Sequence, residues 1–172
     1  YQRVLKQRNE AIRAARKGTR GKENIRTWNP MLVEYGSNIT AERISTLRGM
    51  QKEMEKTAER WNKGKVELKY YSSMGDPHGG GGTPLERVER MEEAEIRRGA
   101  TLVGPHRDEI VINMAGKNVR RECSQGEQKL AVLMWRLAQA SLVAEMSGAG
   151  IILLLDDCLS ELDRKNRETV LE

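Results

Sequence analysis

Two adjacent carboxylates, Asp156 and Asp157, follow an unbroken apolar run in the stretch IILLLDDCLSELD, residues 151–163. An apolar run of this kind predicts a strand at 151–155 that is buried on both faces. In α/β sheets, ligands bind beyond the carboxyl ends of the strands, where both aspartates lie. One carboxylate suits Mg²⁺, and the next points elsewhere and could orient or deprotonate a water. The pair matches the Walker B arrangement of nucleotide hydrolases, although strand ends also carry aspartates for turns.

The stretch SQGEQ, residues 124–128, opens the longest predicted helix. Unpaired N–H groups and a positive dipole end suit an anion such as phosphate, and Gly126 lets a ligand approach the backbone closely. Ser124 adds a hydroxyl and Gln128 an amide. The alternative is ordinary capping, since Ser124 with Glu127 three residues later fits a capping box. For Glu127 we prefer the cap, because a carboxylate facing phosphate would be repelled.

Helical periodicity predicts the elements that precede these motifs. Residues 1–20 form a basic helix, and a second helix begins near Thr27 and is interrupted around Gly36. Asn38 or Thr40 then caps a third helix, whose apolar residues recur at steps of three and four. They form a narrow seam that packs against one neighbouring helix: Ile44, Leu47, Met50, Met54, Ala58 and Trp61.

Strand and loop signals follow. VELKYY, residues 66–71, predicts a strand, and the glycine run in SSMGDPHGGGGTP places a flexible loop at 72–84. Residues 85–99 predict a helix that ends at a glycine. TLVGP, residues 101–105, and EIVINMAGKNVRRE, residues 109–122, predict short strands with a turn around Ala115 to Lys117.

Charge is unevenly distributed along a chain whose net charge is +5. Residues 1–26 hold nine Lys or Arg against two Glu, and such a block can contact nucleic-acid phosphates or simply form a solvated helix face. The candidate DNA contacts are Arg13, Arg16 and Lys17. No apolar run approaches the roughly 18 residues of a membrane span. Two cysteines make neither a disulfide framework nor a zinc site, so a reducing cytoplasm is the expected compartment.

Together, SQGEQ, a helix and IILLLDDCLSELD resemble the signature motif, Walker B and D-loop of ABC-type ATPases. The flanking sequence resembles, more narrowly, the RecF family of bacterial DNA replication and repair proteins. The similarity covers nearly the whole chain and is weakest at residues 79–84. The stretches that carry it are YQRVLKQRN at 1–9, RRGATLVGPHRDEIVI at 97–112, SQGEQKLAVLMWRLAQASL at 124–142 and LLLDDCLSELD at 153–163.

The resemblance implies an α/β (α+β) fold, with a helical arm at 1–95 and the signature and Walker B part of an ATPase lobe at 96–172. It implies that Asp156 holds Mg²⁺ through water and that Asp157 is the catalytic carboxylate. Ser124 and Gly126, with Gln128 in support, would contact the γ-phosphate of ATP bound to the opposite subunit, and Gln125 would be a further ATP-binding residue. Ser160 and Asp163 would form the D-loop at the dimer interface, with a helix cap as the alternative.

The resemblance also implies a function: ATP-dependent binding of DNA at gaps or junctions, as an ATP-dependent homodimer that works with RecR and RecO in loading recombinase. The text GPHRD, residues 104–108, matches the family, but its residues suggest only a turn with a contact between Arg107 and Asp108.

One motif of such ATPases, the P-loop G-x-x-x-x-G-K-[ST], is not found in this sequence. GTRGKEN at 18–24 has the wrong spacing, and GGGGTP at 79–84 has no Lys. We therefore expect a partial piece of a RecF-like protein that does not hydrolyse ATP by itself. The alternatives are a non-catalytic module that binds DNA or protein, and another SMC-like ATPase, which the short arm disfavours.

Overall fold

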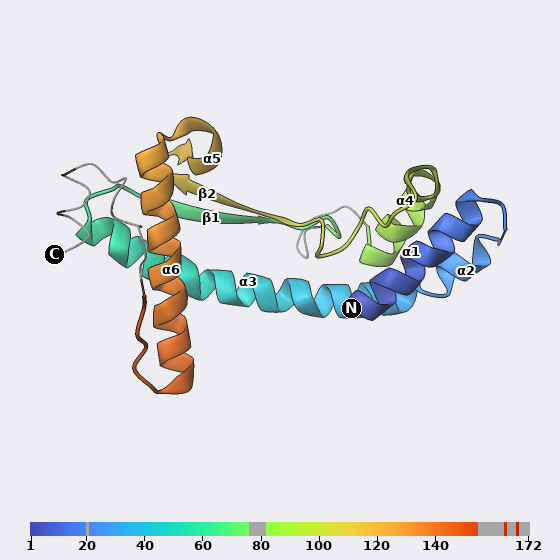
Figure 1. Cartoon of the computed structure of the whole chain (residues 1–172), viewed down its shortest axis with the longest axis horizontal. Coiled ribbons are helices and arrows are strands. Elements are labelled where there is room, and N and C mark those ends of the chain that lie inside the picture. The colour runs from blue at the N-terminus through green and yellow to red at the C-terminus, as the bar shows by residue number, and fades with distance from the viewer. Residues whose placement is uncertain (20, 76–81, 155–163, 165–167, 169–172) are drawn as a thin grey trace. The chain divides into compact units, whose positions relative to one another are not determined.

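The computed structural model describes residues 1–19, 21–75, 82–154, 164 and 168. Its elements follow one another along the chain, and Figure 1 labels each of them except β3. They are α1 (Gln2–Arg16), α2 (Glu23–Arg26), α3 (Asn29–Arg60), β1 (Val66–Tyr71), α4 (Pro84–Arg98), β2 (Glu109–Met114), β3 (Lys117–Asn118), α5 (Val119–Glu122) and α6 (Gln125–Ser147).

Contacts divide the chain into two units, and several elements contribute to both. The first unit comprises Tyr1–Ile44 and Tyr70–Glu109, and the second comprises Ser45–Lys69 and Ile110–Glu172. The long helix α3 and the strands β1 and β2 each contribute residues to both units. The predicted division into a helical arm at 1–95 and part of an ATPase lobe at 96–172 is based on expected function and not on contacts. It stays a prediction.

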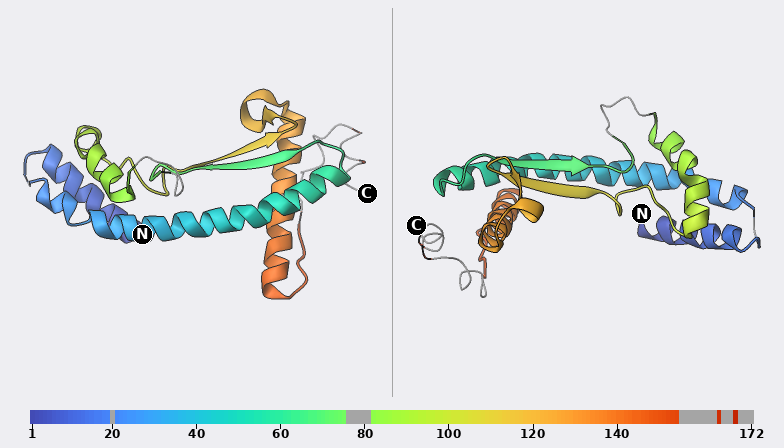
Figure 2. Two further views of the ribbon diagram at one scale, coloured as in Figure 1. Left: turned by 180° about the vertical axis from the view of Figure 1, so that it is seen from behind. Right: turned by 90° about the horizontal axis from the view of Figure 1, so that it is seen from above.

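The first unit is built from α1, α2, α4 and the beginning of α3, and α1 packs against α2 and α4 (Figure 2). Its apolar side chains form two clusters. One contains Val4, Leu5, Leu32, Met74, Val88 and Val103, with Trp28 at its edge. The other contains Ala11, Ile12 and Ile25, and Ile96 of α4 packs against it. The apolar stripe of α1 therefore faces two neighbouring helices.

A charged side chain lies among these apolar residues. Arg8 of α1 is fully buried, and so is its partner Glu95 of α4, with 2.7 Å between Nη2 and Oε2. The same guanidinium donates from Nε to Asn29 and from Nη1 to Thr101, each at 2.9 Å. The second oxygen of Glu95 accepts the N–H of Leu102 at 2.7 Å. A buried charge is tolerated only when it is paired and hydrogen-bonded, as this one is.

The neighbouring residue of α1 completes this network. Asn9 accepts hydrogen bonds from the backbone N–H and the hydroxyl of Thr101, both at 2.8 Å. Two stretches that carry the resemblance, YQRVLKQRN and RRGATLVGPHRDEIVI, are thus in direct contact, although they lie more than ninety residues apart in the sequence.

The second unit pairs the end of α3 with α6. The seam predicted on α3 is confirmed at five of its six residues, because Leu47, Met50, Met54, Ala58 and Trp61 are buried and Ile44 is half-buried. A β-carbon built on Gly49 would lie 2.9 Å from a methyl carbon of Leu142, so glycine permits close packing of the two helices. Gln51 of α3 binds the β1 backbone, donating to the carbonyl of Val66 at 2.7 Å and accepting the N–H of Leu68 at 2.6 Å.

The three strands form one sheet in the order β1-β2-β3, and β2 pairs with β3 in an antiparallel hairpin. Two residues with positive φ join them: Ala115 at 50° and Gly116 at 80°. Tight hairpins favour such turns because their twist matches that of the strands. The predicted strands at 66–71 and from 109, with a turn at Ala115 to Lys117, are confirmed.

Three other local predictions are wrong. Gly36 does not interrupt a helix, because α3 runs continuously through it; a β-carbon there would lie 2.8 Å from Met74 Sδ, so the glycine serves close packing. Residues 101–105 form no strand, because the backbone N–H groups of Thr101 and Leu102 are bound by side chains of other segments. Residues 119–122 form the short helix α5, capped by the side chain of Asn118.

The predicted buried strand at 151–155 is not found in its described part. Residues Ile151 to Leu154 carry no strand, and Ile152 and Leu154 are each 88% exposed. A fully apolar strand is buried only between layers of a larger sheet. The sheet that the structure describes consists of β1, β2 and β3, and it offers no such place.

Removing one member of the buried ion pair should destabilise the chain strongly. We expect Glu95→Ala to lower the free energy of unfolding by about 3–5 kcal/mol, because it leaves a buried, unpaired guanidinium. Urea denaturation measures this. The matched control is Glu93→Ala, whose exposed pair with Lys22 should contribute about 1 kcal/mol or less. Equal losses in the two variants would contradict a structural role for the buried pair.

Candidate functional site

The start of α6 carries the motif predicted to contact nucleotide. Ser124 is the N-cap, and its hydroxyl oxygen accepts the N–H of Glu127 at 3.3 Å. The Glu127 carboxylate accepts the N–H and the hydroxyl of Ser124, both at 2.8 Å. The predicted capping box is therefore confirmed. Gln128 donates from its amide to the carbonyl of Cys123 at 3.0 Å, which ties the helix start to the preceding residue.

Two backbone N–H groups at this helix start have no acceptor within the helix, those of Gln125 and Gly126, because the first turn lacks preceding carbonyls. Apart from its chain neighbours and the adjacent helix backbone, no atom lies within 4 Å of a β-carbon built on Gly126, so the space beside it is open. An anion has access to the backbone here. Hydrogen bonds from the backbone and hydroxyl of Ser124 lower the pKa of Glu127, so its carboxylate is ionised at neutral pH.

The predicted acidic residues cannot be placed beside this helix. Asp156, Asp157, Ser160 and Asp163 all lie outside the described residues. Within the described ranges, no group of three or more His, Cys, Asp or Glu could hold a metal ion. The structure thus positions the signature residues, and the roles of the four others stay predictions.

The GPHRD stretch, residues 104–108, forms a hydrogen-bonded turn in the first unit. Asp108 accepts the N–H of Ser73 at 2.7 Å and also the hydroxyl of Tyr70. The N–H of Gly104 donates to Ser73 Oγ at 2.8 Å, which closes the turn on the segment after β1. The predicted contact between Arg107 and Asp108 is not made, because the carboxylate is bound by the segment around Ser73 and Arg107 donates instead to the carbonyl of Thr101 at 3.4 Å.

His106 of this turn connects Tyr1 with Thr101. Its Nε2 lies 3.2 Å from the carbonyl of Thr101 and must donate to it, so Nδ1 accepts the hydroxyl of Tyr1 at 2.7 Å. Both bonds are satisfied by neutral imidazole. Burial lowers the pKa of His106, and burial also raises the pKa of Tyr1 to about 12. His106 and Tyr1 are therefore both neutral at physiological pH.

The basic block at residues 1–26 is divided between structural and exposed charges. Arg8 is buried, Arg26 forms two hydrogen bonds to Glu92 at 3.0 and 3.1 Å, and Lys22 pairs with Glu93 at 3.4 Å. The three candidate DNA contacts, Arg13, Arg16 and Lys17, are exposed at the end of α1. The structure therefore leaves them available to a ligand.

Sequence reasoning missed the buried network, although a signal was present. Arg8 lies on the apolar stripe of α1, at the four-residue step between buried Val4 and buried Ile12. Glu92 and Glu95 occupy the equivalent stripe of α4, four and seven residues after buried Val88. A charge at a position that helical periodicity assigns to the core predicts a buried partner on a neighbouring helix.

No family model matches the chain. Its whole length is 34% identical to a DNA replication and repair protein RecF from Picosynechococcus sp., of which it covers 48%. It is likewise 34% identical over its whole length to RecF from Desulforudis audaxviator, of which it covers 49%. The chain thus spans about half the length of these curated relatives. In the described part, no helix has the length and apolarity needed to cross a membrane.

Solved structures show the same likeness. The recombination mediator protein RecF of the RecFOR pathway, solved with ATP, matches 99% of this chain and 47% of its own length, with a TM-score of 0.85 at 28% identity. A second structure of that mediator, with ATPrS, covers 95% of this chain with a TM-score of 0.84 at 28% identity. The predicted fold class, a mixed helix and strand chain of the ABC-type ATPase kind, is confirmed.

Acidification should weaken the fold through His106. Its pKa is lowered from 6.5 in the folded state, so below that pH the unfolded chain binds a proton that the folded chain does not. We expect the free energy of unfolding to fall as the pH drops from 7.5 to 5.5, measured by urea denaturation. In His106→Gln the same change of pH should have a smaller effect. An identical dependence in both proteins would show that this imidazole is not responsible.

Proposed function

Since the chain is, along its whole length, a homologue of RecF, we propose that it is the helical arm and signature portion of a DNA replication and repair protein of that type. The single observation that carries this proposal is the agreement of sequence and fold over the entire chain, at 34% identity and a TM-score of 0.85. The complete protein would bind DNA in an ATP-dependent manner, at gaps or junctions, and support recombinase loading. Its partners would be mediators of the RecR and RecO type.

In this proposal the start of α6 serves a nucleotide bound to a second copy of the protein. The accessible N–H groups of Gln125 and Gly126, at the positive end of a 23-residue helix, suit a γ-phosphate. Ser124 and Gln128 flank them. Asp156 would hold Mg²⁺ and Asp157 would act on the attacking water, with Ser160 and Asp163 at the interface between the copies. Mg²⁺ would neutralise charge that develops on the phosphates.

The DNA-binding part of the proposal rests on the exposed cations of α1. Neutralising phosphates with Lys and Arg releases counterions, so the affinity of such a surface falls steeply with salt. DNA binding is favoured over a merely solvated helix face because the cations of the basic block fall into two groups, paired and unpaired with α4. Arg8, Arg26 and Lys22 pair with α4 carboxylates, whereas Arg13, Arg16 and Lys17 project from the last turn and the end of α1.

Replacing the signature glycine should uncouple nucleotide from DNA. In the complete gene product we expect Gly126→Ala to abolish the increase in DNA affinity caused by ATP, because a methyl group would occupy the approach to the backbone. The fold itself has room for that methyl, and alanine should add about 0.5–1 kcal/mol of helix stability. DNA affinity with and without ATP, measured by fluorescence anisotropy, tests this.

The control for this variant is Ser147→Ala, an exposed residue at the other end of α6. It should leave the ATP response intact. If Gly126→Ala retained a normal response, the helix start would not be a nucleotide contact. If the wild-type protein showed no ATP response at all, the non-catalytic binding module would replace the RecF-type proposal.

Charge removal at the end of α1 should flatten the dependence of DNA affinity on salt. A chain in which Arg13, Arg16 and Lys17 are all replaced by Gln should lose about 2.7 from the slope of log affinity against log salt, at about 0.9 per phosphate contact. Titrations of DNA affinity between roughly 50 and 200 mM salt measure this slope. An unchanged slope would mean that these three residues belong to a solvated helix face and do not contact phosphates.

A further inference from the structure

We propose that the C-terminal ends of α1 and α4 form one surface that binds the phosphate backbone of nucleic acid, and that Arg97 and Arg98 of α4 are part of it. We call this the α1–α4 end surface, defined by Arg13, Arg16, Lys17, Arg97 and Arg98. The inference rests on the proposed DNA binding and assigns it to two helices that lie about eighty residues apart in the sequence.

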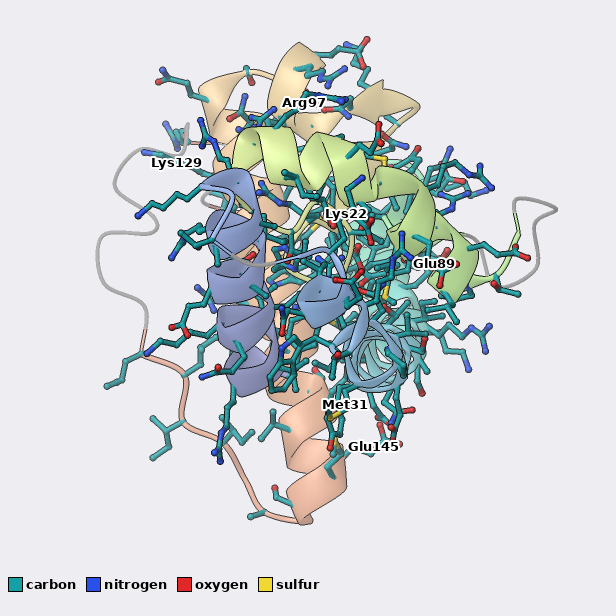
Figure 3. The ribbon with its side chains drawn as sticks, turned by 90° about the vertical axis from the view of Figure 1, so that its right-hand side faces the viewer. Lys22, Met31, Glu89, Arg97, Lys129 and Glu145 are labelled. Atoms are coloured by element: carbon teal, nitrogen blue, oxygen red, sulfur yellow. The ribbon has the colours of Figure 1, made fainter. Side chains whose placement is uncertain are left out.

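The two helix ends are in contact. Arg16 lies against the end of α4, since a β-carbon built on Gly99 would be 3.0 Å from its Nη1. Ala15 of α1 and Ile96 of α4 pack against the same apolar cluster, so the residues that follow each of them emerge side by side. Figure 3 shows Arg97 on the end of α4 that lies next to α1, with Glu89 toward the other end. Arg97 and Arg98 are exposed.

Three acidic residues near the end of α4 are occupied by ion pairs with cations outside this surface. Helix α4 carries five Glu and four Arg, so its sequence suggests an acidic helix. However, Glu92 and Glu95 are buried and bound to Arg26 and Arg8. Glu93 pairs with Lys22. What remains exposed in the last turn of α4 is therefore the positive pair Arg97 and Arg98.

Helix capping explains only part of this arrangement. A cation at a helix C-terminus interacts favourably with the dipole, and Arg16 already occupies that position on α4. Further arginines beside it add repulsion between like charges, which an anion would relieve. Phosphate is a suitable anion because guanidinium groups bind its oxygens in a bidentate manner.

The surface lacks a platform for stacked bases, because residues 9–19 and 93–99 contain no aromatic side chain. We therefore expect its cations to bind chiefly through phosphates. Five cations predict a slope of about −4.5 for log affinity against log salt, at about 0.9 per contact. That slope corresponds to a loss of affinity of roughly 500-fold between 50 and 200 mM salt.

The test is the salt dependence of binding to a duplex of mixed sequence, measured by fluorescence anisotropy with the full chain. We expect Arg97→Gln with Arg98→Gln to reduce the slope by about 1.8. Combined with the three α1 replacements, the loss should be additive, about 4.5 in all. The matched control on the same helix is Arg90→Gln, whose guanidinium lies near Gly82 at the opposite end. It should leave the slope unchanged.

Charge-conserving Arg97→Lys with Arg98→Lys should keep the slope, which guards against an effect of folding alone. If the α1 replacements reduced the slope but Arg97→Gln with Arg98→Gln did not, the α1–α4 end surface would be wrong, while DNA binding through α1 would stand. If the wild-type chain did not bind the duplex at all, both the surface and DNA binding by this part of the protein would be refuted.

Discussion

The buried guanidinium of Arg8 is the constraint on which the first unit depends. A charge in an apolar interior must find enough partners to replace water, and Arg8 finds them on three other segments: Asn29 on α3, Glu95 on α4 and Thr101 on the turn that follows. Each partner is thereby fixed in position. Residue 8 cannot be buried before residues 95 and 101 are present, so α1 acquires its final packing only after most of the unit has been synthesised.

The same constraint determines the electrostatics of the surface. Because Arg8 and Arg26 bind Glu95 and Glu92, these two carboxylates of α4 are buried and do not offset the charge at its end. The arginines at its end then face solvent beside those of α1. The net charge of the chain is only +5, yet the packing brings exposed cations of two helices together at the ends of α1 and α4. A basic surface thus arises from the pairing of buried residues rather than from a basic segment of sequence alone.

The sequence predicted the elements that have a clear period or a clear cap. The seam from Leu47 to Trp61, the strand at 66–71, the helix ending at Gly99 and the capping box at Ser124 all depend on local patterns, and all are present. The failures depend on distant residues. Gly36 looked like a break but packs against Met74, and TLVGP is held in turns by Asn9 and Glu95. The acidic residues after Leu154 remain known from sequence alone.

The capping box at the start of α6 has a consequence for any phosphate that arrives there. A serine hydroxyl has one proton, and in this structure Ser124 donates it to the Glu127 carboxylate at 2.8 Å. A phosphate that accepts a hydrogen bond from this hydroxyl must replace the existing bond to Glu127 and approach its ionised carboxylate. Glu127 thus acts as an intramolecular competitor that occupies the hydroxyl until a stronger anion displaces it. The competition concerns this hydroxyl alone, because the N–H groups of Gln125 and Gly126 have no acceptor within the helix.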